Sequence, residues 1–260
     1  MTPIYRVGSQ LFFAGFRALA LDLRAIDAHH IPRTGPAILA SNHVGYLDFA
    51  FVMLAPPRPR RQIAFLARHD LFEHPVAGPL LTRLDQIPVD VHGDPTAALA
   101  AAADRLRGGD LIALHPEGTI SPSFVPRQGR TGAVRLARET GAPIIPVAVW
   151  GGQRLLTKWR PRSLERGVVV TARYGAPYHP GSGSLVEETA ELMARIEALL
   201  ETSWRRYPQR PGSPGDDWWV PAHLGGSAPT PEQAEARLRE QAEQRRARRA
   251  AAGTDPATHD

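Results

Sequence analysis

Cysteine is absent from this sequence of 260 residues, and Lys158 is its only lysine. The lack of thiols excludes disulfide bonds, cysteine nucleophiles, cysteine-ligated zinc and iron–sulfur clusters. The composition, with 43% hydrophobic and 22% charged residues, is that of an ordinary globular chain. Collagen, wholesale disorder and a coiled coil are therefore excluded.

Long hydrophobic runs are absent as well. No uninterrupted apolar stretch approaches the roughly 20 residues that a bilayer-spanning helix needs. Arg17, Asp22 and Arg24 interrupt the apolar part of the N-terminus, and no small-residue cleavage site follows. Because this pattern is not that of a cleavable signal peptide, we expect a cytoplasmic protein.

Acidic residues are fewer than basic ones, 26 against 31, which gives a net charge of +5. Residues 208–260 contain seven arginines and eight acidic residues, so a charge of +6 lies on residues 1–207. A basic body suits anionic lipid, phosphorylated substrates or nucleic acid. The cations are scattered and form no recognised nucleic-acid motif, so we do not expect nucleic acid as a partner.

The N-terminal residues follow a helical hydrophobic period. Over residues 4–24 the apolar side chains recur at steps of three and four, which predicts an amphipathic helix. With arginines on another face, such a helix suits a lipid headgroup layer, and packing on the domain's own core is the alternative of equal weight. We assign residues 1–30 to a membrane-associating segment. The apolar residues are Ile4, Val7, Leu11, Phe12, Phe16, Leu19 and Leu23, and the arginines are Arg6, Arg17 and Arg24.

Short aliphatic runs alternate with helical patterns over residues 31–207. This alternation predicts an α/β domain in which helices flank a central, mostly parallel sheet. Chemistry in such sheets gathers at the loops beyond the C-terminal ends of the strands. The expected strands are 37–41, 62–67, 87–91, 110–115, 144–150 and 168–174, and the expected helices are 47–55, 75–84, 95–107, 130–140 and 185–204.

The composition changes after Tyr207 to a linker rich in proline, glycine and serine. Trp218 and Trp219 indicate that part of this linker packs back on the domain or touches lipid. Thr230 and Gln233 are the residues of a capping box, which predicts the start of a helix. Since that helix has few apolar residues, we expect residues 208–260 to be a linker and a marginal charged helix, partly disordered.

A first chemical motif follows the first of these strands. His43 stands at the strand end, and Asp48 follows five residues later in the first turn of the next helix. A carboxylate that folds back onto one ring nitrogen fixes the tautomer and leaves the other nitrogen as a base. This is the His–Asp part of a catalytic triad in which a substrate hydroxyl replaces the serine. The alternative is a helix-capping aspartate beside an incidental histidine.

A second motif follows the strand at 110–115. The turn Pro116-Glu117-Gly118-Thr119 combines a rigid entry, a carboxylate, a flexible glycine and a hydroxyl. Such a turn can offer hydrogen bonds to an anion or a polyol. Taken alone, it is equally well a tight turn.

The two motifs, in this order, resemble those of the glycerolipid acyltransferase family, the relatives of 1-acylglycerol-3-phosphate acyltransferase. Four blocks of that family occur in order over residues 37–150. They are Asn42, His43 and Asp48 for the first; Arg68, Leu71, Pro75 and Gly78 for the second; Pro116 to Thr119 with Ser121 for the third; and Ile144 to Val149 for the fourth.

The resemblance implies transfer of a fatty acyl group from acyl-coenzyme A or acyl carrier protein to the hydroxyl of a lysophospholipid such as 1-acylglycerol-3-phosphate, in phospholipid biosynthesis. It implies that His43 is the base and Asp48 its partner, with no metal and no cofactor besides the acyl donor. We expect the protein to act peripherally at the cytoplasmic face of a membrane. The residues expected to bind substrate are Asn42, Arg68, Glu117, Gly118, Thr119, Arg127 and Arg130.

Two residues depart from the family pattern. His115 replaces a phenylalanine, and Ile120 replaces an arginine that is expected to contact the phosphate of the acceptor. Arg68, Arg127 and Arg130 are the candidates to replace that arginine. One alternative is therefore an acyltransferase for a glycolipid or another lipid acceptor, and a second is a catalytically idle lipid-binding scaffold. The intact His43 and Asp48 favour an enzyme.

Overall fold

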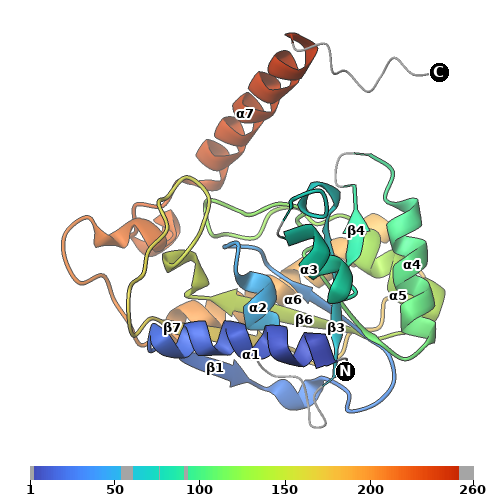
Figure 1. The fold of residues 1–260 in the computed structure, drawn as a ribbon. Helices are drawn as coiled ribbons and strands as arrows, with labels where there is room; N and C mark the ends of the chain where they lie inside the picture. Colours follow the sequence, from blue (N-terminus) through green and yellow to red (C-terminus); the bar gives the residue numbers. More distant parts are fainter. Residues whose placement is uncertain (1–2, 54–60, 76, 91–92, 252–260) are drawn as a thin grey trace. The chain divides into compact units, whose positions relative to one another are not determined.

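The computed structural model describes residues 3–53, 61–75, 77–90 and 93–251. Its centre is a seven-stranded sheet with helices on both faces (Figure 1). The strands are β1 (Asp22–Ile26), β2 (Ala37–Ser41), β3 (Ile63–Arg68), β4 (Ile87–Val89), β5 (Leu111–Leu114), β6 (Ile144–Trp150) and β7 (Val169–Tyr174). The α-helices are α1 (Pro3–Ala18), α2 (Asp48–Val52), α3 (Ala77–Arg83), α4 (Thr96–Arg107), α5 (Gly132–Thr140), α6 (Leu185–Arg206) and α7 (Pro231–Ala251).

The strand order is β1-β7-β6-β2-β5-β3-β4. Strands β6, β2, β5, β3 and β4 run parallel to one another, whereas β7 is antiparallel to β6 and β1 is parallel to β7. The prediction of a mostly parallel α/β sheet is confirmed. Since β6, β2 and β5 are neighbours with one direction, their C-terminal ends lie side by side at one edge of the sheet.

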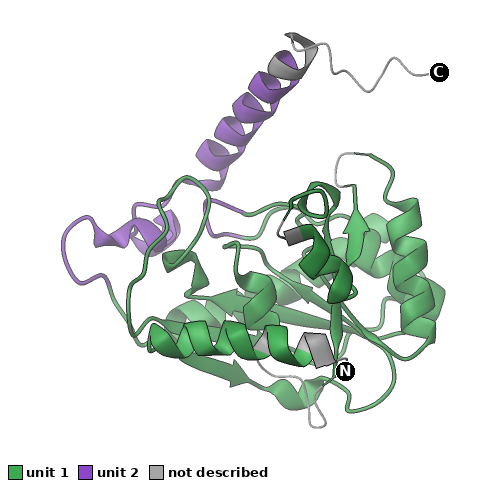
Figure 2. Ribbon diagram, viewed as in Figure 1, with its two compact units in different colours: residues 1–120, 126–210 green, residues 121–125, 211–260 purple. Residues whose placement is uncertain are grey.

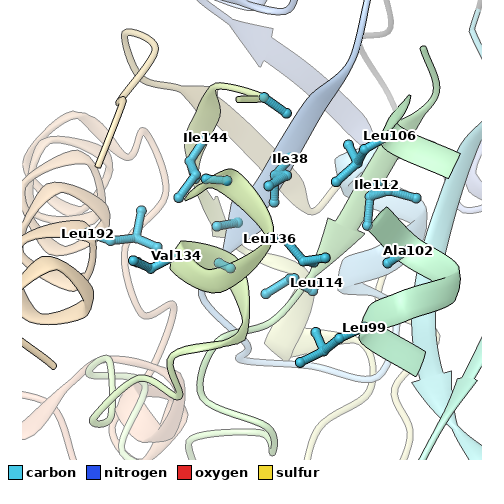
Figure 3. Packing of buried hydrophobic residues seen from close by; sticks show 14 of the residues in the cluster. Ile38, Leu99, Ala102, Leu106, Ile112, Leu114, Val134, Leu136, Ile144 and Leu192 are labelled. Atoms are coloured by element: carbon cyan, nitrogen blue, oxygen red, sulfur yellow. The ribbon is translucent and has the colours of Figure 1, made fainter. Parts of the chain in front are cut away.

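Two apolar clusters cover the two faces of the sheet. On β2, Ala37 and Leu39 pack in the cluster that includes side chains of α1 and α2, while Ile38 and Ala40 pack in the cluster of α4, α5 and α6. Successive side chains of a strand point to opposite faces, so a strand buried on both faces is apolar throughout. Figure 3 shows the second cluster, in which Ile38 lies among side chains of the neighbouring strands and helices.

The N-terminal helix is shorter than its hydrophobic period predicts. It ends at Ala18, Ala20 has a left-handed φ of 51°, and the amide of Leu21 donates to the carbonyl of Phe16 at 3.0 Å. Residues 22–26 then form β1, which pairs with β7. The expected helix over residues 4–24 is therefore wrong beyond Ala18, because pairing with a distant strand outweighs the local period.

Helix α1 packs its aromatic side chains on the domain's own core. The ring of Phe12 meets that of Phe49 edge-on at 5.3 Å, and the ring of Phe16 stacks on that of Phe51 at 5.1 Å. Val7 and Leu11 stay 56% and 69% exposed. The helix is thus docked through one side and presents an apolar strip on another. Among the described helices, none is long and apolar enough to cross a bilayer.

The chain divides into two compact units, residues 1–120 with 126–210, and residues 121–125 with 211–260 (Figure 2). In the second unit, the ring centroids of Phe124 and Trp218 are 6.5 Å apart, so Trp218 packs on the segment 121–125. The predicted capping box is present, since the amide of Gln233 donates to Oγ1 of Thr230 and the Gln233 side chain accepts from the Thr230 amide.

Parts of several expected elements lie outside the described residues. They are Leu54 and Ala55 of the expected helix 47–55, Val76 of the helix 75–84, Val91 of the strand 87–91, and residues 252–260 of the tail.

The end of α1 is testable through Ala20. Glycine adopts a left-handed φ more readily than alanine, so Ala20→Gly should raise the free energy of unfolding by about 0.5–1 kcal/mol. If the helix instead continued through position 20, the same change should lower it by about 1 kcal/mol. Urea denaturation measures the sign, and Ala14→Gly inside the helix is the matched control, for which we expect a loss.

Candidate active site

The turn between β2 and α2 brings His43 and Asp48 together. The Nδ1 atom of His43 lies 2.9 Å from Oδ2 of Asp48, as the five-residue spacing predicts. The amides of Val44 and Gly45 donate to the same oxygen at 2.7 and 2.8 Å. Three donors thus hold the carboxylate in place at the start of α2, and the carboxylate in turn holds the imidazole.

Gly45 is required where this turn meets the loop that follows β6. A Cβ atom at position 45 would lie 2.9 Å from the carbonyl oxygen of Leu156. The amide of Tyr46 donates to that same carbonyl at 3.0 Å. The close approach of the two backbones therefore leaves no room for a side chain.

Burial dominates the electrostatics of the His43–Asp48 pair. Burial, and then the positive charge of Lys158, lower the pKa of His43, so its imidazole is neutral near pH 7. Burial raises the pKa of Asp48, and the hydrogen bonds from Gly45 and Val44 act in the opposite direction. A neutral imidazole whose Nδ1 donates to Asp48 has its basic lone pair on Nε2, as a general base requires.

The side chain of Asn42 binds the backbone of β6. Its side chain is fully buried, its Nδ2 donates to the carbonyl of Val149 at 3.0 Å, and its Oδ1 accepts from the Val149 amide at 2.7 Å. These bonds fasten the end of β2 to β6. Because Asn42 precedes His43 in the chain, these bonds also fix the backbone beside His43, and substrate binding by Asn42 stays a prediction.

Glu117 also binds backbone. Its Oε1 accepts from the amide of His43 at 2.8 Å and its Oε2 from the amide of Arg127 at 3.0 Å. Burial raises the pKa of Glu117 to about 8, although the two amide donors oppose this effect. The buried carboxyl group thus ties the turn after β5 to the turn after β2, and contact of Glu117 with substrate stays a prediction.

His115 stacks on His43. The two imidazole rings are 4.0 Å apart and 4° from parallel, and Nδ1 of His115 lies 2.9 Å from Oγ of Ser41. An aromatic ring is thus kept where the family has phenylalanine. Burial, and then the neighbouring His43, lower the pKa of His115. The side chain acts as a hydrogen-bonded wall of the site.

The loop after β6 completes the surroundings of His43. The hydroxyl of Thr157 donates to the carbonyl of Val44 at 2.6 Å, and Nζ of Lys158 donates to Oγ1 of Thr119 at 2.5 Å. The sequence-based analysis missed Lys158 as a site residue. The signal was available, because β6 is parallel to β2 and its loop must leave the sheet at the same edge.

The three arginines that are candidates for phosphate binding have different surroundings. The guanidinium of Arg130 lies beside Gly118, where a Cβ atom would stand 2.8 Å from its Nε. Arg127 contributes its backbone amide to Glu117, as described above. Arg68 forms an ion pair with Asp70 at the exposed end of β3. The side chain of Arg130 therefore lies beside the Gly118–Thr119 turn, and the charge of Arg127 is near enough to lower the pKa of Glu117.

Ile120 is only 2% exposed, so a buried apolar side chain stands at the position expected to carry the phosphate-binding arginine. Within the part of the chain that the structure describes, no group of three or more His, Cys, Asp or Glu side chains is placed to hold a metal ion.

The bracing role of Glu117 is tested with Glu117→Gln. The side-chain NH₂ of glutamine cannot accept, so one backbone amide loses its partner, and the free energy of unfolding should fall by about 1–3 kcal/mol. Displacement of His43 should lower kcat and leave KM for the lipid nearly unchanged. Urea denaturation and steady-state kinetics measure both, with the exposed Glu73→Gln as control. A raised KM at unchanged stability would instead indicate contact with substrate.

The sequence is similar to that of a known protein family. Residues 22–150 match the family model described as Acyltransferase. A 1-acyl-sn-glycerol-3-phosphate acyltransferase of Bacillus subtilis is 24% identical over 180 residues, which are 68% of this chain and 84% of that protein. An uncharacterized protein of Mycobacterium tuberculosis is 30% identical over 164 residues, which are 58% of this chain and 42% of that longer protein.

A solved structure is similar in fold. The 1-acyl-sn-glycerophosphate acyltransferase PlsC from Thermotoga maritima superposes with a TM-score of 0.65 at 23% identity, covering 79% of this chain and 80% of that one. The family match begins at the first residue of β1 and contains both the His43–Asp48 turn and the Glu117–Thr119 turn. This chain is a member of the acyltransferase family.

Proposed function

We propose that this acyltransferase moves a fatty acyl group from acyl-coenzyme A or acyl carrier protein to the free hydroxyl of a lysophospholipid such as 1-acylglycerol-3-phosphate, as a step of phospholipid biosynthesis. The observation that carries the proposal is the 2.9 Å contact between Nδ1 of His43 and Oδ2 of Asp48. The names of the relatives from Bacillus subtilis and Thermotoga maritima support this acceptor.

The chemistry proceeds by direct transfer. Nε2 of His43 removes the proton of the acceptor hydroxyl as its oxygen attacks the carbonyl carbon of the thioester. The new C–O bond forms, the C–S bond breaks, and the departing thiolate takes the proton back from the imidazolium. Asp48 stabilises that imidazolium while it exists. Because no acyl-enzyme is needed, the site must hold both substrates together, and we propose neither a metal nor a further cofactor.

An acceptor without phosphate is the second candidate. The observation that favours it is the burial of Ile120, which puts an apolar side chain where the family pattern has an arginine. A glycolipid or another neutral lipid hydroxyl would not need that cation. The two candidates share the same base and differ only in the headgroup that the site receives.

Membrane association is the third part of the proposal, and we place it at a cytoplasmic membrane face. The apolar strip of α1 formed by Val7 and Leu11 is exposed. The contact between Phe12 of α1 and Phe49 of α2 joins this helix to the element that carries Asp48. A net charge of +6 on residues 1–207 adds attraction to anionic lipid. A lipid acceptor would thus meet the enzyme near the catalytic pair.

The membrane contact is tested with Leu11→Glu. Loss of an inserted leucine should weaken binding to vesicles of phosphatidylcholine and phosphatidylglycerol by about tenfold or more, at unchanged stability. Val186→Glu is the matched control, since Val186 is 64% exposed at the start of α6, whose core side chains pack on the other face of the sheet. Sedimentation with vesicles gives the result. Equal binding by both variants would exclude α1 as the contact.

The reaction is tested by mass spectrometry on purified enzyme. Long-chain acyl-coenzyme A and acyl carrier protein are each offered with lysophosphatidate, other lysophospholipids and a neutral glycolipid. We expect phosphatidate from the wild type and at least about 100-fold less from His43→Ala, because the general base is lost. The backbone amide of His43 is still present in that variant to donate to Glu117, so circular dichroism should show a preserved fold.

The other outcomes separate the alternatives. Acylation of the glycolipid alone would favour the acceptor without phosphate. No acylation with either donor would favour a lipid-binding scaffold. Equal activity of His43→Ala and the wild type would contradict the proposed mechanism.

A further inference from the structure

Lys158 is the only lysine of the chain, and it reaches the candidate site from the loop that follows β6. Its Nζ donates to the hydroxyl of Thr119 at 2.5 Å. Thr119 belongs to the same turn as Glu117, whose carboxylate binds the amide of His43. The ammonium group therefore stands at the turn that is braced against the catalytic histidine.

The loop that carries Lys158 is fixed at several points. Next to it, the buried Thr157 donates to the carbonyl of Val44 in the His43 turn. Nearer to β6, the buried guanidinium of Arg154 pairs with Glu165 and donates to Gln209. These contacts hold the base of the loop and the segment beside Lys158, so the position of its side chain is set before any ligand arrives.

Positive charge flanks the Gly118–Thr119 turn from two sides. The guanidinium of Arg130 lies beside Gly118, and Lys158 binds Thr119. The charge of Lys158 is also near enough to His43 to lower the pKa of its imidazole. A phosphate monoester carries up to two negative charges, and it is recognised by cationic donors together with hydroxyl groups.

We propose that Lys158 is a specificity residue that binds the phosphate monoester of the lipid acceptor, with the Thr119 hydroxyl beside it. This inference rests on the proposed function. It assigns to the loop after β6 the contact that the family pattern expects from an arginine at the position of Ile120. An ammonium group has three donors, so it can serve Thr119 and a phosphate oxygen together.

The experiment compares Lys158→Met, which removes the charge, with Lys158→Arg, which keeps it. Arg162→Met is the matched control, because it removes an exposed cation from the same loop. With lysophosphatidate and acyl-coenzyme A as substrates, Lys158→Met should raise KM for lysophosphatidate roughly 10- to 100-fold, the effect of a lost hydrogen bond to a charged group. KM for acyl-coenzyme A should stay within about twofold, and Lys158→Arg should recover part of the loss.

The pH profile tests whether the charge of Lys158 acts on His43, while the KM values test the contact with phosphate. Removal of the positive charge should raise the pKa of His43, so the acid limb of kcat/KM should shift to higher pH in Lys158→Met. Arg162→Met should leave the limb in place. A loss confined to kcat, an equal rise in KM for acyl-coenzyme A, or an unchanged KM for lysophosphatidate would each overturn the inference.

A binding measurement separates this inference from the proposed function. Because Lys158 is the only lysine, acetic anhydride can modify just one side-chain amine, and mass spectrometry follows that peptide. Glycerol 3-phosphate should slow the acetylation of Lys158 in a saturable manner, whereas glycerol should not. Protection in an enzyme that forms no phosphatidate would refute only the proposed acceptor. Phosphatidate formation without protection would refute the role of Lys158.

Discussion

The candidate site depends on one buried carboxylate that joins two turns. Glu117 lies in the turn after β5, and His43 lies in the turn after β2. The carboxylate of Glu117 accepts hydrogen bonds from the backbone amides of His43 and Arg127. A buried carboxylate without such donors would be costly, and unpaired amides would be as well. These hydrogen bonds satisfy the carboxylate and both amides, and they fix the distance between His43 and the Gly118–Thr119 turn. Bracing of this kind is how loops attain the precision that catalysis needs.

The sheet explains why these turns meet at all. Strands β6, β2 and β5 are parallel neighbours, so the Lys158 loop, the His43 turn and the Glu117 turn emerge at one edge. Each turn is then fastened to the next by hydrogen bonds from Asn42, Glu117 and Thr157. His115 and Ile120, the two residues that depart from the family pattern, both lie in or next to the turn after β5. His115 keeps an aromatic ring against His43. Ile120 is buried, and Lys158 places a cation at the neighbouring Thr119.

The two faces of the sheet are covered by different helices. One face is covered by α4, α5 and α6 through a cluster of aliphatic side chains, which gives the rigidity on which the strand ends rely. The other face carries α2, which holds Asp48, and α1, whose aromatic side chains pack on α2. Asp48, at the start of α2, and helix α1 with its exposed Val7 and Leu11 therefore lie on the same face of the sheet. In the second unit, the segment 121–125 directly follows the Glu117 turn in the chain and packs with Trp218.

Features that depend on near neighbours in the chain can be predicted from the amino-acid sequence alone. Periodicity located the strands β2 to β7 and most helices, and the five-residue spacing of His43 and Asp48 was enough to pair them. Contacts between residues far apart in the chain follow from the fold and could not be predicted in this way. β1 exists because it pairs with β7, Asn42 and Glu117 have backbone partners on other elements, and Lys158 meets Thr119. The physical reason is that hydrophobic period and capping act within a few residues, whereas strand pairing and buried polar contacts are chosen by the whole fold.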